Sequence, residues 1–401
     1  MRVAIATTEF PAPSQTFVLD HAAALAERGH EVELLPAQRG QGQQADGPAL
    51  KVHYPPEPRP RTRAQLLGAL WQSAGARLAL RLPVLWRLYG AGDSRRFERI
   101  AQAHPFLRHG YDLVHCHFGY RALQLLPMFE CGLVRAPLVV TFHGHDAQGY
   151  TQGQAPQLYA GLFRRVARMF VASEFMRGEL LRLGAPESRI AVVPNGIRLG
   201  QFRLAPRPAG GGPLRVLTVA RLLEVKGIRF GIEAVARLRQ AGVAARYVVV
   251  GDGPLRDELR VQAQAAGIAA DVEFPGALPR PAVLEQLARA HVFLYPGVVT
   301  AAGDAEAHGI ALIEAQACGL PVVATRVGGV PETLAAGAGN VLVAPGDAGA
   351  LAAALAQVLA NPGRWAEWGA AARAHVESRF NLDLQVDELV RHYHAVLAAA
   401  A

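Results

Sequence analysis

Short apolar runs rich in Val, Ile and Leu alternate along the chain with longer segments whose apolar residues recur at three- and four-residue steps. Runs of the first kind predict buried strands, and segments of the second kind predict amphipathic helices. In the first half a helix is expected over Thr16–Arg28, and the expected strands are Val3–Thr7, Glu31–Leu35, Leu113–His117, Leu138–His143, Met169–Ser173 and Ile190–Val193. This alternation is typical of a parallel sheet covered on both faces by helices.

A second series of the same kind begins after residue 213. Its expected strands are Arg215–Val219, Tyr247–Val250, Val272–Phe274, Val292–Tyr295, Pro321–Ala324 and Val341–Val343, and its expected helices are Leu222–Ala241, Leu255–Ala266, Pro281–Ala290 and Ile310–Cys318. Each series is long enough for one doubly wound domain, so the expected fold class is α/β with two Rossmann-like domains. Ligands of such domains bind at the carboxyl ends of the strands, and we expect the two domains to face one another across a cleft there.

The length of the chain also favours two domains, because one hydrophobic core rarely supports 401 residues. The stretch RLAPRPAGGGP at residues 203–213 resists any regular element and is the best candidate for a linker. We therefore expect an N-terminal domain over residues 1–202 and a C-terminal domain over residues 214–380. Residues 381–401 predict a final helix, which we expect to return to the N-terminal domain.

The net charge of +8 comes entirely from the first half of the chain. Residues 1–200 carry 23 basic and 15 acidic side chains, whereas residues 201–401 carry 18 of each. A polyanionic partner should therefore meet the first half. No nucleic-acid-binding motif and no interleaving of basic with aromatic residues accompanies the charge, so we expect no nucleic-acid partner.

Cysteine usage and the N-terminal sequence indicate a cytoplasmic protein. Cys116, Cys131 and Cys318 are odd in number and far apart, which suggests neither a disulfide framework nor a CxxC metal site. The first residues, MRVAIATTEF, lack the layout of a signal peptide, and no apolar run reaches about 18 residues. We expect a reducing compartment and no membrane-spanning segment.

The segment 59–99 combines an apolar stripe with nine arginines and only two acidic residues. One interpretation is a pair of amphipathic helices packed on the core, with their arginines solvated. The other is a surface that rests on anionic lipid headgroups, because tryptophan at a polar boundary and arginine beside an apolar stripe suit such a surface. The candidate residues for this membrane or acceptor surface are Arg77, Arg81 and Arg87.

The first strand-to-helix turn lacks the glycine-rich sequence of dinucleotide-binding folds. Its loop, TEFPAPSQT, contains no glycine. Ser14, Gln15 and Thr16 offer hydroxyl, amide and backbone N–H donors to an anion, and plain capping of the following helix explains them equally well.

Four histidines, His115, His117, His143 and His145, gather at the ends of two expected strands, with Asp146 beside them. A metal site is one interpretation, but a single strand end rarely supplies a whole coordination sphere, so we expect no metal. His115 is assigned a structural role. His143 is followed by a glycine, which lets a substrate approach the backbone, and it is the candidate site residue.

Two anion sites are expected in the second half. Arg221 and Lys226 follow a strand and suit a diphosphate, because Arg offers a fork of donors and Lys a point charge. The alternative is that both are solvated cations at a helix start. The backbone N–H groups of Gly309, Ile310 and Ala311 begin another helix and form the second site.

Two carboxylates flank the start of that second helix. Glu306 lies before it, and Glu314 lies about one turn inside it. One carboxylate can reach a polyhydroxylated group while the other accepts hydrogen bonds from a ribose. Neither is placed for a two-carboxylate hydrolase, whose pair must straddle one bond.

Taken together, these residues resemble the retaining glycosyltransferases of family 4, which have two Rossmann-like domains in the GT-B fold. The motifs run through most of the chain: P-x-P-S-x-T-F-V at Pro11–Val18, R-G-H-E-V at Arg28–Val32, F-H-G-x-D at Phe142–Asp146, V-P-N-G-I at Val193–Ile197, A-R-L-x-x-x-K-G at Ala220–Gly227, V-G-D-G-P-L at Val250–Leu255, the E-x7-E pair, A-C-G-L-P-V-V-A-T at Ala317–Thr325 and G-G-V-P-E at Gly328–Glu332. Each motif alone is weak, but the ordered set is specific. The S-x-T-F and F-H-G-x-D details are similar to the branch that builds exopolysaccharides, such as the colanic-acid transferases.

The resemblance implies a nucleotide-sugar donor bound mainly by the C-terminal domain. It assigns the diphosphate to Arg221 and Lys226, helped by the amides of Gly309–Ala311. It assigns the ribose to Glu314 and the hydroxyl groups of the donor sugar to Glu306.

The resemblance also implies further contacts and a mechanism. Gly251 and Leu278 would lie near the base, Ser14–Thr16 would replace a glycine-rich turn, and His143 would meet the transferring sugar at the reaction centre. Retention in this family is explained by front-face attack, in which the leaving phosphate takes the proton of the acceptor. Neither an enzymic nucleophile nor a metal or other cofactor is then needed.

One departure from the family pattern follows the first glutamate. Family members usually have glycine and then an apolar residue there, whereas this chain has Ala307 and His308. The added Cβ and imidazole would narrow or alter the pocket for the donor sugar.

The sequence thus predicts a hexosyltransferase that uses a UDP- or GDP-sugar and a saccharide acceptor, which the basic first half suggests is lipid-linked. We expect a cytoplasmic enzyme with peripheral contact to the inner face of the cytoplasmic membrane. The alternatives are a nucleotide-sugar epimerase of the same fold, a catalytically inactive nucleotide-sugar-binding protein and, more remotely, a metal hydrolase.

Overall fold

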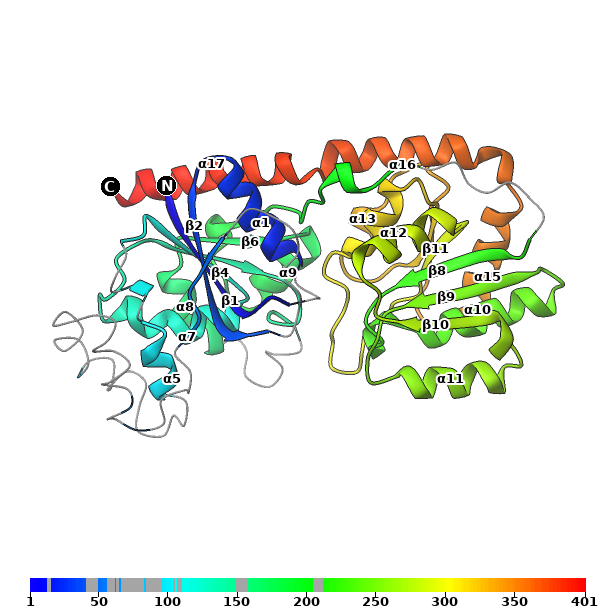
Figure 1. Cartoon of the computed structure of the whole chain (residues 1–401), viewed down its shortest axis with the longest axis horizontal. Helices are drawn as coiled ribbons and strands as arrows, with labels where there is room; N and C mark the ends of the chain where they lie inside the picture. Colours follow the sequence, from blue (N-terminus) through cyan, green and yellow to red (C-terminus); the bar gives the residue numbers. More distant parts are fainter. Residues whose placement is uncertain are drawn as a thin grey trace. The chain divides into compact units, whose positions relative to one another are not determined.

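The computed structural model describes residues 1–12, 16–40, 50–55, 62, 65, 83, 96–103, 105, 106, 110–148, 157–204 and 212–401. They form two compact units (Figure 1). Unit 1 comprises Met1–Val171, Arg177–Val193 and Val386–Ala401, and unit 2 comprises Ala172–Met176 and Pro194–Gln385. Unit 2 therefore begins before the linker expected from the sequence, of which residues 205–211 lie outside the described part.

Unit 1 is built on a seven-stranded parallel sheet with the order β3-β2-β1-β4-β5-β6-β7. The strands are β1 Arg2–Phe10, β2 Glu31–Arg39, β3 Lys51–Val52, β4 Leu113–His117, β5 Leu138–Phe142, β6 Arg168–Val171 and β7 Ile190–Val192. All five residues of β4 and of β5 are buried, as expected for central strands covered on both faces.

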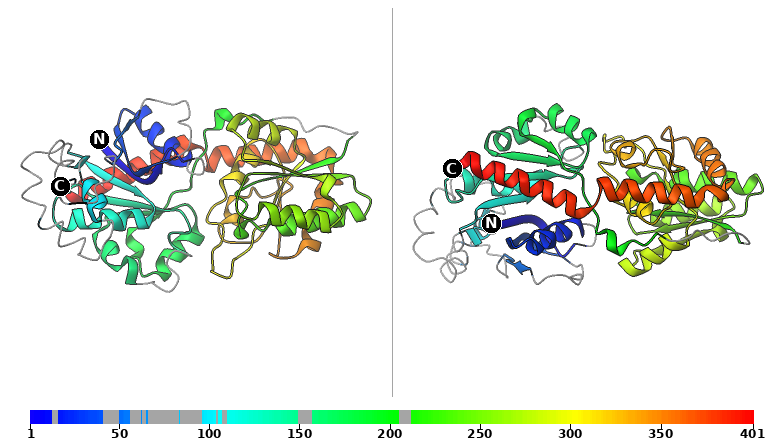
Figure 2. Two further views of the ribbon diagram at one scale, coloured as in Figure 1. Left: turned by 60° about the horizontal axis from the view of Figure 1, so that its bottom comes forward. Right: turned by 90° about the horizontal axis from the view of Figure 1, so that it is seen from above.

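The helices of unit 1 follow the strands in alternation. They are α1 Thr16–Glu27, α5 Arg96–Ala101, α7 Gly119–Glu130, α8 Gln157–Arg165 and α9 Glu174–Arg182, whose first residues belong to unit 2, together with the C-terminal helix α17 Leu382–Ala400. The final part of α17 belongs to unit 1 and lies along it (Figure 2). Asp387 pairs there with Arg28 at 2.6 Å, and His392 contacts the Phe170 ring with centroids 5.5 Å apart.

Unit 2 is built on a six-stranded parallel sheet with the order β10-β9-β8-β11-β12-β13. The strands are β8 Leu214–Val219, β9 Ala245–Val250, β10 Val272–Gly276, β11 Val292–Tyr295, β12 Val322–Thr325 and β13 Val341–Val343. Its helices are α10 Ile228–Gln240, α11 Arg256–Ala265, α12 Arg280–Arg289, α13 Ile310–Ala317, α14 Val330–Thr333, α15 Ala348–Leu359 and α16 Trp365–Arg379. The two parallel sheets confirm the α/β class and its two Rossmann-like domains.

Two apolar clusters bury the two faces of the unit 2 sheet. One joins the strands to α10 and α15 through residues such as Val235 and Leu355. The other joins them to α12, α13 and α16 through residues such as Leu287, Ile313 and Val376. This arrangement leaves the carboxyl ends of the strands as the edge where loops carry polar side chains.

One expected helix starts later than its apolar pattern suggests. The pattern predicts a helix from Leu222, but α10 begins at Ile228 after the 3-10 turn Glu224–Lys226. Gly227 ends that turn with φ 59°, and a Cβ on it would lie 2.0 Å from the carbonyl oxygen of Pro296. Only glycine fits there, so the chain turns sharply and holds Lys226 close to the end of β11.

Several residues singled out in the sequence lie outside the described part of the chain. They are Ser14 and Gln15 in the first loop and Arg77, Arg81 and Arg87 in the basic segment. Among the helices that the structure describes, none combines the length and the apolar character needed to cross a bilayer.

Candidate active site

Lys226 lies in the turn after β8 and Glu306 in the loop between β11 and α13, and the structure brings these two separately predicted residues together. The Lys226 ammonium forms an ion pair with Oε2 of Glu306, and the Tyr295 hydroxyl donates a hydrogen bond of 2.7 Å to the same oxygen. The Lys226 ammonium also lies 5.6 Å from the centre of the Tyr295 ring. Tyr295 is the last residue of β11, so all three side chains meet at the carboxyl edge of the sheet.

The surroundings of Glu306 keep its carboxyl group ionised. Burial alone would raise its pKa, but the Lys226 charge, the Tyr295 hydroxyl and the backbone N–H of His308 outweigh burial and lower the pKa to about 2. Burial and the neighbouring carboxylate raise the pKa of Tyr295 well above its usual value. Glu306 is therefore a fixed hydrogen-bond acceptor, which suits hydroxyl groups of a sugar.

The backbone of Glu306 is held by the paired glycines of the G-G-V-P-E motif. The Gly329 N–H donates to the Glu306 carbonyl oxygen at 2.8 Å. A Cβ on Gly328 would lie 2.0 Å from that same oxygen, so a larger residue does not fit. The motif thus fixes the position of the carboxylate.

The first turn of α13 presents backbone amides beside this carboxylate. Gly309 precedes the helix with φ 81°, and among the described residues no side chain caps this end. Gly309, Ile310 and Ala311 are partly exposed. Free amides and the positive end of the helix dipole favour an anion at this point.

Glu314 has a cationic partner that the sequence did not reveal. Arg280, the first residue of α12, donates from Nη1 to Oε1 of Glu314 at 3.0 Å. The Arg280 guanidinium also covers the Phe202 ring at 4.9 Å and donates to Gln201. No motif pointed to Arg280, because the contact depends on how α12 packs beside α13.

The remaining predicted donor-site residues of unit 2 have different surroundings. Arg221 is exposed. Gly251 has φ 137°, and a Cβ on it would lie 1.9 Å from the Ala220 carbonyl oxygen. The backbone therefore requires glycine at this position, whether or not the residue contacts a nucleotide base. Leu278 packs partly against the second apolar cluster of unit 2.

His308, the departure from the family pattern, is turned toward the interior of unit 2. Its side chain is buried and meets the Phe380 ring edge-on, with centroids 5.6 Å apart. Its Nε2 atom lies 3.4 Å from the carbonyl oxygen of Asn195. Burial lowers the pKa of His308 to about 4, so the ring is neutral near pH 7.

His143 of unit 1 follows β5 and is partly buried. The buried Asp146 carboxylate holds the backbone there: Oδ1 accepts from the N–H groups of His143 and Gly144 at 2.9 and 3.0 Å, and Oδ2 accepts from the Gly119 N–H at 2.7 Å. Burial raises the pKa of Asp146 despite these amides. The F-H-G-x-D motif is therefore a device that fixes the backbone of His143.

Aromatic rings enclose the His143 imidazole. The centroid of Phe17 lies 4.5 Å from that of His143, and the centroid of Phe118 lies 4.7 Å from it. Phe118 has φ 76°, the one non-glycine residue with positive φ among those described. Such strain persists where the surroundings impose it, often at a functional site. Thr16, by contrast, is exposed at the start of α1.

Three buried imidazoles lie behind His143. The ligand atoms of His21, His115 and His117 lie within 4.8 Å of one another, so a metal ion must be considered. The rings of His115 and His117 are stacked, with centroids 4.7 Å and planes 14° apart. The nitrogen lone pairs lie in these nearly parallel ring planes, which disfavours the two rings binding one ion together. His145 is exposed.

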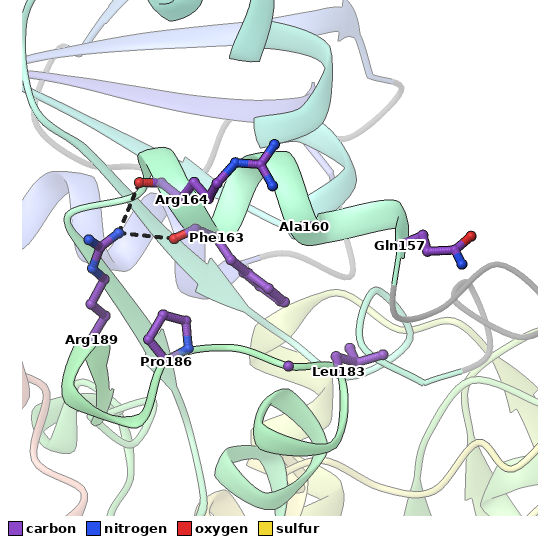
Figure 3. Close-up of a pocket in the computed structure, with 8 residues that line it drawn as sticks. Gln157, Ala160, Phe163, Arg164, Leu183, Pro186 and Arg189 are labelled. Atoms are coloured by element: carbon purple, nitrogen blue, oxygen red, sulfur yellow. Dashed lines mark hydrogen bonds between the residues drawn. The ribbon is translucent and has the colours of Figure 1, made fainter.

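A hollow of about 470 Å³ lies elsewhere on unit 1, between α8 and the segment 183–189 (Figure 3). Arg189 borders it, but its guanidinium donates to the carbonyl oxygens of Phe163 and Arg164 at 2.9 and 3.0 Å (Figure 3). Arg189 thus caps the end of α8, which is a structural role.

Both halves of the sequence match known families. Residues 14–201 match the family described as Glycosyltransferase Family 4, and residues 205–375 match Glycosyl transferases group 1. The colanic acid biosynthesis glycosyltransferase WcaL of Salmonella typhimurium is 34% identical over 89% of this chain and 90% of its own length. The amylovoran biosynthesis glycosyltransferase AmsK of Erwinia amylovora is 30% identical over 97% and 98%.

Solved structures resemble the whole chain. Anabaena HepE, crystallised with UDP, gives a TM-score of 0.71 at 18% identity and covers 98% of this chain and 100% of its own. The sucrose-phosphate synthase of Thermosynechococcus elongatus gives 0.76 at 19% identity over the full length of both. These likenesses confirm the expected GT-B fold. With relatives of 30% identity or more along nearly its entire length, the chain belongs to glycosyltransferase family 4.

Proposed function

We propose that this protein is a retaining hexosyltransferase that moves a sugar from a UDP- or GDP-sugar to a lipid-linked saccharide acceptor in exopolysaccharide synthesis. The observation that carries the proposal is the grouping of Lys226, Glu306 and Tyr295 beside the first turn of α13. Cationic and amide donors for phosphate and a fixed acceptor for sugar hydroxyls lie together there.

The donor's diphosphate is assigned to Lys226, Arg221 and the amides of Gly309–Ala311. A diphosphate needs compensating positive charge, and a lysine with helix N-terminal amides is a common way to provide it. Glu314 is assigned to the ribose, with Arg280 keeping the carboxylate in place. Gly251 and Leu278 remain assigned to the base.

The charge state of Glu306 supports a mechanism without an enzymic nucleophile. A carboxylate paired with Lys226 and with a pKa near 2 is a weak nucleophile, but it can hold the hydroxyl groups of the donor sugar. In front-face transfer the bond from C1 to the phosphate oxygen breaks, a bond from C1 to the acceptor oxygen forms, and the acceptor proton passes to the departing phosphate. No metal and no other cofactor enters this proposal. His143 is assigned to the transferring sugar.

The biological role and the donor are proposed from relatives and charge. WcaL and AmsK are named for colanic acid and amylovoran biosynthesis, which supports an exopolysaccharide product. HepE was crystallised with UDP, and a mannosyltransferase of Mycolicibacterium smegmatis, 31% identical over 59% of this chain, is named as GDP-mannose-dependent. The proposal therefore includes both UDP-sugars and GDP-sugars as donors. The basic first half favours an acceptor with a diphosphate or lipid anchor.

Ligand-induced stabilisation tests the donor class. We expect UDP or GDP, at a hundredfold excess over its dissociation constant, to stabilise the protein by about 2.7 kcal/mol. ADP at the same concentration should stabilise it less. The stabilising nucleotide then selects the sugar donors for a transfer assay with lipid-linked saccharide extracts. A product that retains the donor's anomeric configuration supports the proposal, and inversion contradicts it.

Incubation with the donor alone separates transfer from the rival activities. An isomer of unchanged mass, formed without acceptor, would identify an epimerase. Tight nucleotide binding with no turnover of any donor would identify an inactive binding protein.

A further inference from the structure

A continuous line of hydrogen bonds runs from the interior of unit 1 to His143. It begins at Thr141, whose hydroxyl lies 2.7 Å from Nε2 of His115, and Nδ1 of His115 lies 2.5 Å from the Tyr393 hydroxyl. That hydroxyl lies 3.3 Å from Nε2 of His21. The line joins β5, β4, α17 and α1, which are far apart in the sequence.

The same line continues outward through a second pair of contacts. Nδ1 of His21 lies 3.1 Å from Nε2 of His117, and Nδ1 of His117 lies 2.9 Å from Nε2 of His143. His21, His115, His117 and Tyr393 are at most 7% exposed. Each imidazole between the two ends therefore uses both of its nitrogens inside this line, which we call the histidine chain.

Each buried imidazole of the histidine chain is neutral. Burial lowers the pKa of His21 to about 3 and the pKa values of His115 and His117 well below the usual value. A neutral imidazole donates from one nitrogen and accepts at the other. A protonated one would donate from both sides and interrupt the line.

Neutral imidazoles leave two arrangements in which every contact of the line is a hydrogen bond and the single hydroxyl hydrogen of the buried Tyr393 is also donated within it. In one, Nε2–H of His143 donates to His117, and every bond points inward until His115 donates to Thr141. In the other, Thr141 donates to His115, and every bond points outward until His117 donates to His143. In the first arrangement all four histidines carry their hydrogen on Nε2, and in the second all four carry it on Nδ1. The reason is that each buried ring faces its outer neighbour with Nδ1 and its inner neighbour with Nε2.

We propose that His21, His115, His117 and Tyr393 are positioning residues that tie the tautomer of His143 to one all-or-none arrangement of the histidine chain. The partly buried His143 ring at the end of the histidine chain then has a single defined donor and a single defined acceptor nitrogen. A single tautomer matters for an imidazole that must hydrogen-bond a sugar in one orientation, so the functional role of the coupling rests on the proposed glycosyl transfer. The coupling of the tautomers does not depend on that activity.

Tyr393 makes the coupling depend on the C-terminal helix. Its hydroxyl is the one link between His21 and His115, since the two rings contact each other only through an edge-on packing with centroids 5.1 Å apart. Helix α17 therefore supplies a functional hydroxyl, besides its packing on unit 1.

Histidine nitrogen NMR measures the tautomers directly and needs no substrate. The full-length protein, labelled with 15N in its histidines, is studied at about pH 8, where an ordinary imidazole with pKa near 6.5 is neutral. Signals are assigned by their loss in single His→Asn variants. We expect His21, His115, His117 and His143 to share one tautomer. A mixed set would overturn the proposal, as would one equivalent of zinc in the purified protein, because a metal would replace the shared hydrogens.

The Tyr393→Phe variant cuts the histidine chain at its only hydroxyl bridge. We expect His143 to pass from one tautomer to a mixture, and kcat to fall about tenfold with little change in the donor KM, the size typical of losing a partner that orients an imidazole. An unchanged His143 tautomer would overturn the proposal. Thr141→Val, which removes the inner end, is the second variant if Tyr393→Phe does not fold.

Tyr247→Phe is the matched control. It removes another fully buried tyrosine hydroxyl, which bonds to Thr218 at 2.8 Å in unit 2. We expect it to leave all four tautomers unchanged. If the four histidines share one tautomer but His143→Ala has wild-type turnover, the coupling holds and the role assigned to His143 is refuted. If the tautomers are mixed but His143→Ala loses turnover, the role of His143 holds and the coupling is refuted.

Discussion

Lys226 and Glu306, 80 residues apart in the sequence, form one ion pair at the carboxyl edge of the unit 2 sheet. They meet because β8 and β11 are neighbours in that sheet, so the turn after β8 and the loop after β11 lie side by side. The pair is mostly shielded from solvent, with 17% and 13% of the two side chains exposed. Each side chain therefore compensates the charge of the other in a place with little access to water.

Replacing Lys226 with Ala should impair both folding stability and transfer. The change leaves the Glu306 carboxylate buried without its cation, which costs about 3 kcal/mol or more in comparable pairs. It also removes the charge assigned to the diphosphate, so we expect turnover to fall at least about a hundredfold. Thermal unfolding and initial-rate assays measure the two effects. Arg229→Ala, which removes an exposed cation from the start of α10, is the control and should change neither. Normal turnover in Lys226→Ala would reject the site assignment.

The acid stability of the protein should carry a contribution from Glu306. Its pKa is lower in the folded protein, about 2, than in the unfolded chain, about 4.5, so the stabilisation is complete above pH 4.5 and disappears as the pH falls toward 2. A shift of this size corresponds to about 3 kcal/mol.

Urea unfolding between pH 2 and pH 6 measures this contribution as the difference in the free energy of unfolding between the wild type and Glu306→Gln. We expect that difference to shrink as the pH falls below about 4.5. A difference that stays constant over the whole range would show that ionisation of Glu306 contributes nothing. The same variant should remain folded at pH 7 and lose transfer, since an amide cannot replace the ionised acceptor.

Replacing Asp146 with Asn should disturb the backbone that carries His143. An amide side chain presents an NH₂ group to at least one of the three backbone N–H groups that the carboxylate accepts, which leaves a buried donor unsatisfied. We expect a loss of about 1–3 kcal/mol in the free energy of unfolding and a lower kcat. Chemical denaturation and steady-state kinetics measure both. An unchanged stability would refute the role of Asp146 as the anchor of this loop.

The sequence predicted which strands follow one another along the chain and which residues lie at their carboxyl ends, because buried strands and turn residues leave local patterns. Strands β4, β11 and β13 have the bounds that these patterns predict. Local patterns also marked Lys226, Glu306 and His143, which lie in short motifs at strand ends.

Partners supplied by packing were not visible in the sequence. Tyr295 is indistinguishable from a core residue of β11 until its hydroxyl is seen on Glu306. His21 lies in the middle of α1, and Tyr393 lies 372 residues further on. Only the pairing order of the sheet and the packing of α1 and α17 bring such residues together, and single-sequence periodicity contains neither.

Arg280 should affect the donor KM more than kcat. Its guanidinium holds Glu314, to which we assign the ribose, and the ribose is remote from the bond that breaks. We expect Arg280→Ala to raise the donor KM several-fold, about the effect of losing 1 kcal/mol of uniform binding, with kcat within about twofold. Arg289→Ala on the same helix removes an exposed pair with Glu285 and is the control. A fall in kcat with unchanged KM would contradict the ribose assignment.

Binding of the protein to anionic membranes should depend on the basic segment 59–99. Each arginine near an anionic surface contributes about 1 kcal/mol, so replacing Arg77, Arg81 and Arg87 with Gln should weaken binding to phosphatidylserine vesicles by about a hundredfold. Binding of the wild type should also weaken as salt rises, because salt screens such attraction. Vesicle co-sedimentation measures both effects.

A charge-matched variant separates the segment from the total charge. Three exposed arginines of unit 2 are replaced with Gln in this control, namely Arg229, Arg237 and Arg260. If overall net charge drove binding, both triple variants would lose affinity equally. If the segment 59–99 is the contact, the control should bind like the wild type. Equal binding by all three proteins would reject a membrane role for the segment and favour the interpretation of its apolar stripe as part of the core.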